Sequence, residues 1–119
     1  MTLKNIRALM RRKKFQTAFS QVEKALKHYK ECPNLWNIRG DLIQLIEAKD
    51  APPLSEAAKS YRRALKLNPN CLESIESLAH YYDAVDPQPA KARYYANVYV
   101  KKAEDILYQM KKILADTSK

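Results

Sequence analysis

The feature that most constrains this chain is a helix-forming stretch, residues 55–70, that recurs along the sequence. Its small and apolar residues recur at three- and four-residue spacing, on one face of a helix: Ala57, Ala58, Tyr61, Ala64, Leu65 and Leu67. Arg62, Arg63 and Lys66 fall on the opposite face, and Pro69 follows the last turn, where a helix cannot easily continue. The alanines predict a second helix that approaches closely around Tyr61.

A shift of 39 residues aligns this stretch with two other parts of the chain. The small positions align in three copies, and the larger residue between them aligns as well: Ala18/Ala57/Ala96, Val22/Tyr61/Val100 and Ala25/Ala64/Ala103. The same shift places Trp36 on Ile75 and Gly40 on Ala79. Three copies in register indicate a chain built from stacked helical repeats.

We predict six helices, over residues 2–13, 15–29, 33–48, 55–68, 72–84 and 87–116, in one all-α domain of residues 1–119. One glycine and six prolines among 119 residues fit such a chain. Ser55 and Asp86 are expected to cap helices, and Pro33 to open one. Helical spacing predicts that Trp36, Tyr61, Tyr82 and Tyr95 lie in the core and that Tyr81 and Tyr94 are exposed.

These residues resemble the tetratricopeptide repeat, whose pattern is W-x2-L-G-x2-Y, then A-x3-F, then P. The residues that fit the pattern best lie within residues 33–71: Trp36, Gly40, Ala57, Tyr61, Ala64 and Pro69. Arg39 departs from it, because leucine is usual there, and the period of 39 exceeds the usual 34. The resemblance implies a right-handed superhelical stack of three antiparallel helix pairs, at about 2–30, 33–68 and 72–107, with the last helix extended over about 108–117.

The resemblance also implies a concave face, lined by the first helix of each pair, that binds a partner peptide or helix. The residues at the corresponding positions are Arg7, Arg11, Asn34, Asn37, Asp41, Gln44, Glu73, Glu76, His80 and Asp83. One end of this set is basic and the other acidic, so we expect a partner with a basic or polar segment. The carboxylate clamp of the chaperone-binding members is not expected, because Glu73 and Ser77 stand where it needs cations. The alternative is that these polar residues only solvate exposed helices.

Charge leaves a second class of function open. Residues 1–30 carry nine Lys or Arg residues against the single acid Glu23. A patch made by residues 11–14 with Lys24, Lys27 and Lys30 is a candidate phosphate-binding surface, so a nucleic-acid-associated protein is the alternative to an adaptor. The acidic middle of the chain weakens that alternative, and a solvated helix face explains the lysines equally.

Nothing in the sequence predicts an enzyme, a metal site or a cofactor. His28 and His80 are the only histidines, and neither belongs to a catalytic or phosphate-binding motif. Cys32 and Cys71 lie one repeat apart, and equivalent sites on stacked helices are about 10 Å apart, too far for a disulfide. We therefore expect free thiols and a reducing, cytoplasmic location. No apolar run is long enough to span a membrane.

The last predicted helix is longer than its repeat needs. Apolar residues follow a heptad-like 3-4-3-4-3 spacing along it: Ala96, Tyr99, Ala103, Ile106, Met110 and Ile113. Beyond about Leu107, Met110, Ile113 and Leu114 remain apolar surface unless something covers them. Two interpretations follow: the tail caps the end of the stack, which we favour, or it mediates self-association, as in a homodimer or an oligomerisation scaffold.

Overall fold

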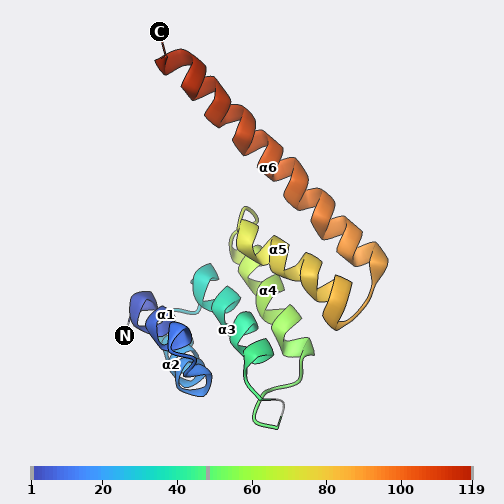
Figure 1. Cartoon of the computed structure of the whole chain (residues 1–119). Coiled ribbons are helices and arrows are strands. Elements are labelled where there is room, and N and C mark those ends of the chain that lie inside the picture. The colour runs from blue at the N-terminus through green and yellow to red at the C-terminus, as the bar shows by residue number, and fades with distance from the viewer. Residues whose placement is uncertain (1, 48, 119) are drawn as a thin grey trace. The chain divides into compact units, whose positions relative to one another are not determined.

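The computed structural model describes residues 2–47 and 49–118, and this part of the chain is helical, without strands (Figure 1). The elements are α1 (Leu3–Arg11), α2 (Phe15–His28), α3 (Pro33–Leu45), α4 (Ser55–Leu67), α5 (Leu72–His80), the π-helical turn η1 (Tyr81–Val85) and α6 (Pro89–Thr117). The predicted all-helical class and the predicted order of helices are confirmed.

The chain divides into two compact units, Met1–Ser74 and Ile75–Lys119. In the first unit consecutive helices pack on one another, α1 on α2, α2 on α3 and α3 on α4. The apolar faces predicted from helical spacing form its core: Ile6, Ala18, Val22, Ala25, Leu26, Leu35, Ile38 and Leu42. Helical spacing would also place Tyr29 and Leu45 inside, but both are exposed, because each lies at or beyond the last turn of its helix.

The closest approach in the first unit is between α3 and α4. Tyr61 is 1% exposed, and its ring lies directly over Gly40. A Cβ atom at position 40 would lie 2.5 Å from Cε1 and 2.7 Å from Cζ of that ring. Ala57 and Ala64 are both fully buried on either side of Tyr61. The prediction of a small-residue contact around Tyr61 is therefore confirmed.

The helix ends differ from the prediction. Ser55 is already helical and makes no cap, since Leu54 precedes the helix without a side-chain cap bond. At the start of α6 the capping position is Gln88, which also makes no side-chain cap; its Nε2 instead donates to Oδ2 of Asp86 at 2.8 Å. Both cap predictions were wrong, whereas Pro33 does open α3.

The end of α1 was also placed too late. The helix ends at Arg11, and Lys13 has a φ of 58°, in the left-handed region that normally favours glycine. The N–H of Lys14 donates to the carbonyl of Leu9, and that of Lys13 to the carbonyl of Met10, which is the bonding pattern of a Schellman motif. Because this position holds lysine, no glycine marks the end of the helix in the sequence.

The second unit contains the rest of α5, then η1 and α6. The N–H of Asp86 bonds to the carbonyl of Tyr81, five residues back, as in a π-turn. Tyr81 and Tyr82 are both buried, with ring centroids 5.1 Å apart. The exposed position predicted for Tyr81 was wrong, because Tyr81 follows the buried Leu78 by three residues and therefore lies on the same face of the helix.

The packing between η1 and α6 is aromatic. The Tyr82 and Tyr95 rings are stacked with centroids 6.0 Å apart, and Nζ of Lys91 lies 5.1 Å from the centroid of the Tyr82 ring. Tyr94 is 62% exposed, as predicted. These contacts anchor the first turns of α6.

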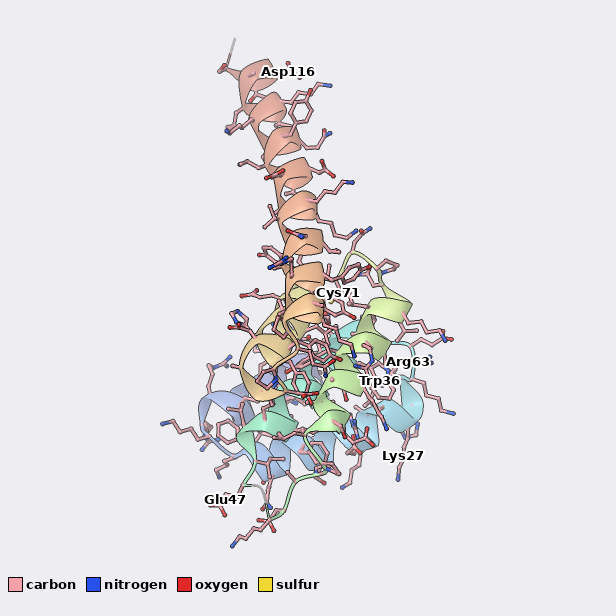
Figure 2. All side chains as sticks on the ribbon, turned by 90° about the vertical axis from the view of Figure 1, so that its right-hand side faces the viewer. Lys27, Trp36, Glu47, Arg63, Cys71 and Asp116 are labelled. Carbon is pink, nitrogen blue, oxygen red and sulfur yellow. The ribbon has the colours of Figure 1, made fainter. Side chains whose placement is uncertain are left out.

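The 29 residues of α6 run without interruption, which corresponds to about 43 Å at 1.5 Å per residue (Figure 1). None of its side chains is buried. Figure 2 shows side chains projecting on all sides of the helix toward its end near Asp116. Within the part of the chain that the structure describes, no helix is both long and apolar enough to cross a membrane.

Candidate functional site

Four of the polar residues predicted to face a partner lie on one face of α3. Asn34, Asn37, Asp41 and Gln44 are spaced by three, four and three residues, so their side chains leave the helix on the same side. Asn34 and Gln44 are exposed, Asp41 is half-buried and Asn37 is buried. The face is therefore accessible at its ends and closed in the middle.

Asn37 belongs to the packing of the first unit. Its Oδ1 accepts a hydrogen bond of 2.9 Å from the hydroxyl of Ser74, which lies 3.3 Å from the sulfur of Cys71. Asn37 is 4% exposed and Ser74 is fully buried. An amide held in this way fixes the start of α5 against α3. The prediction that Asn37 contacts a partner at the surface was therefore wrong.

Asp41 and Gln44 meet on the hydroxyl of Tyr61. The hydroxyl donates to Oδ1 of Asp41 at 2.7 Å and accepts from Nε2 of Gln44 at 2.7 Å. The ring itself is held against α3, so the hydroxyl has a fixed position. The carboxylate of Asp41 is thereby oriented, while part of it stays open to solvent.

Burial raises the pKa of Asp41 above its ordinary value of 3.8. The hydrogen bond from Tyr61 acts in the opposite direction, and the negative charge of Glu73 raises the pKa further. Two carboxylates, one half-buried and one exposed, therefore repel each other on this surface. A cation placed between them would relieve that repulsion.

The remaining residues of the predicted face fall on other elements. Arg7 and Arg11 are exposed on α1. Glu76 and His80 belong to the second unit, where Nε2 of His80 lies 3.8 Å from Oε1 of Glu76. Asp83 lies in η1, beyond the point at which the helical period changes, so its spacing from Glu76 and His80 no longer guarantees a shared face. The structure thus brings together Asn37, Asp41, Gln44 and Glu73 in the first unit.

The sequence did not reveal the role of Arg39. Its Nε donates to Oε1 of Glu23 on α2 at 2.7 Å, and its Nη1 donates to the hydroxyl of Ser60 on α4 at 2.8 Å. The guanidinium also lies 5.8 Å and 5.9 Å from the ring centroids of Phe19 and Trp36. One side chain thus ties α2, α3 and α4 together. The only indication in the sequence was that Arg39 stands where the tetratricopeptide pattern has leucine.

The basic residues of the first helix pair are solvent-facing. Residues 11–14 are exposed around the turn between α1 and α2, as are Lys24 and Lys27 on α2. Figure 2 shows Lys27 and Arg63 on the outside of the first unit. Glu23, the one acid of residues 1–30, is bound by Arg39. This placement fits a solvated face as well as a phosphate-binding one.

One surface hollow of the first unit lies beside the turn between α1 and α2. The hollow beside the α1–α2 turn has a volume of about 560 Å³ and is lined by lysines, apolar side chains and the residues that follow α3. Within residues 2–47 and 49–118, no three His, Cys, Asp or Glu side chains are close enough to share a metal ion. Cys32 and Cys71 are free thiols.

The predicted self-association residues are exposed on α6. Met110, Ile113 and Leu114 are 48%, 52% and 67% exposed, and Ile106 and Leu107 on the same stripe are about half exposed. Both interpretations of the tail, a cap at the end of the stack and self-association, therefore stay predictions.

Comparison with known proteins finds no family model, curated protein or solved structure that matches this chain.

Proposed function

We propose that this chain is a non-enzymatic protein–protein interaction module built as a tetratricopeptide-like stack of helix pairs. The support for the stack is the contact between Gly40 and Tyr61, flanked by buried Ala57 and Ala64, at the positions where the family pattern has its small and aromatic residues. The module binds a partner peptide or helix on the surface formed by α3 and the start of α5.

The observation that carries this proposal is the acidic pair Asp41 and Glu73 in a chain of net charge +9. The hydroxyl of Tyr61 holds Asp41 in a fixed orientation, and Glu73 is exposed at the surface. Two neighbouring carboxylates, one of them held in place, suit a Lys or Arg side chain of the partner. Asn34 and Gln44, exposed on the same face of α3, supply polar contacts to the partner backbone.

Selection from a displayed library of random peptides tests this function without knowledge of the natural partner. We expect the full chain to enrich peptides with a Lys or Arg residue, and the enriched peptides to bind more weakly as salt rises. Glu73→Lys should lower the affinity of an enriched peptide by 10-fold or more, because it reverses the charge that faces the cation.

The matched control is Asp50→Lys, which makes the same charge change at an exposed position in the loop between α3 and α4. It should leave the affinity within about twofold, because only general screening changes. Equal losses in the two variants would mean that the peptides respond to net charge and would refute the proposed site.

A second candidate function is assembly through α6. The exposed stripe of large apolar residues favours it, because such surface on a soluble chain usually marks an interaction site. In this case the partner helix packs along α6, and the surface of α3 remains free for another ligand.

A further inference from the structure

The apolar stripe of α6 is not symmetric about its heptad seam. If Ala103 and Met110 are placed at heptad position a, then Ile106 and Ile113 occupy position d. The residues that follow position d, at position e, are also apolar: Val100, Leu107 and Leu114. The opposite edge, at position g, is polar and contains Lys102, Gln109 and Asp116. One edge of the seam is therefore apolar and the other is polar.

This asymmetry decides how two such helices can pair. In a parallel pair each e edge lies against a g edge, so Leu107 and Leu114 would be placed against polar side chains. In an antiparallel pair e edges lie against e edges and g edges against g edges. The apolar edges then cover each other, and the polar edges stay together at the solvent.

We propose that α6 binds the α6 helix of a second copy of this chain in antiparallel orientation, centred near residue 108. This proposal rests on assembly through α6, the second candidate function above. The occupant is a second copy because the asymmetric stripe, placed antiparallel to itself, covers its own exposed apolar side chains, which are Val100, Ile106, Leu107, Met110, Ile113 and Leu114.

The register follows from the sizes of the side chains. With the centre at residue 108, Ile106 packs against Met110 of the second copy, and Ala103 packs against Ile113, a small residue against a large one. On the e edge Leu107 meets its own equivalent, and Val100 meets Leu114.

The polar edge matches in the same register. Lys102 of one copy lies opposite Asp116 of the other, and the two Gln109 side chains face each other. The opposite charges occur twice in a symmetric pair. The overlap, residues 99–117, corresponds to about 28 Å of helix, and the antiparallel arrangement puts the helix starts near Pro89 at opposite ends of the pair.

Sedimentation of the full chain over a range of concentrations tests the association. Leu107→Glu should weaken the dimer by at least 10-fold, because it places two carboxylates against each other at the centre of the apolar edge. The matched control is Tyr108→Glu, one residue along on the other side of α6, where the side chain is 65% exposed; it should leave the dimer unchanged. Circular dichroism checks that both variants keep their helix content.

Disulfide formation in mixtures tests the orientation. Chains with Ala103→Cys are mixed with differently sized chains that carry Ile113→Cys, and the mixture is mildly oxidised, with the native chain as the background for Cys32 and Cys71. Antiparallel pairing predicts cross-links only between the two kinds of chain. Cross-links within each kind would show a parallel pair and overturn the orientation while leaving self-association intact. A native chain that stays monomeric at every concentration would overturn both.

Discussion

Replacing Gly40 with alanine tests the packing of α3 against α4. The added Cβ would lie 2.5, 2.7 and 2.8 Å from three atoms of the Tyr61 ring. These separations are about 1 Å below carbon–carbon contact distance, so the ring has to move. The ring is buried and its hydroxyl is held by Asp41 and Gln44, so movement also strains two hydrogen bonds.

The expected magnitude combines two opposing effects. Overpacking a well-packed core costs about 1–3 kcal/mol, and weakening the bond to a charged acceptor adds about 1 kcal/mol. The better helix propensity of alanine offsets about 1 kcal/mol. We expect Gly40→Ala to lower the free energy of unfolding by about 2 kcal/mol, which corresponds to a Tm decrease of about 10 °C in a unit of this size.

The assay is thermal and urea unfolding of the full chain, followed by circular dichroism. A double-mutant cycle with Tyr61→Leu identifies the cause, because the shorter side chain leaves room for the new Cβ and Gly40→Ala should then be neutral or stabilising. If Gly40→Ala stabilises the chain that retains Tyr61, the close contact and the reasoning built on it are wrong.

Three further predictions concern the first unit. Arg39→Ala should lower the free energy of unfolding by about 2 kcal/mol in urea denaturation, because the Arg39 side chain is only 15% exposed and bonds to two helices. Glu23→Ala should lower it by less than about 1 kcal/mol, because the Glu23 side chain is 41% exposed. Because burial raises the pKa of Asp41 above 3.8, the protonated carboxyl stabilises the fold at low pH, and that contribution is lost as pH rises through the raised pKa. Asp41→Asn, which keeps an acceptor oxygen, should therefore gain stability relative to the native chain between pH 3 and pH 7. A stability difference that does not change with pH would contradict this. Lys13→Gly should raise the free energy of unfolding by about 1 kcal/mol, because glycine accepts a φ of 58° without a Cβ clash, and a decrease would mean that the turn adopts another conformation.

Periodicity located most of the fold because its signal is spread over many residues. The alanines and the aromatic residue of residues 55–70 predicted the α3–α4 contact correctly, since small residues at helical spacing leave few other arrangements. Features that depend on one bond were missed. Lys13 in place of glycine concealed the end of α1, and nothing in the sequence indicated the π-turn at Tyr81–Val85.

The candidate site was predictable only in part, because spacing gives the face of a helix and not the hydrogen bonds of its side chains. Asn37 shares a face with Asp41 but is used by Ser74 inside the unit. The pairing of Glu73 with Asp41 needs the fold, since 32 residues separate them. Arg39 departs from the tetratricopeptide pattern, but its bonds to Glu23 and Ser60 depend on how three helices pack and do not follow from spacing.

The most direct test of the proposed binding surface is a map of backbone amide chemical shifts during titration of the full chain with a library-selected peptide that contains Lys or Arg. We expect the largest changes on residues 34–44 and around Glu73, with the side-chain amide of Gln44 among them, and we expect Glu73→Lys to remove them. Changes confined to α6, or to the exposed lysines of α2, would show that the peptide binds elsewhere.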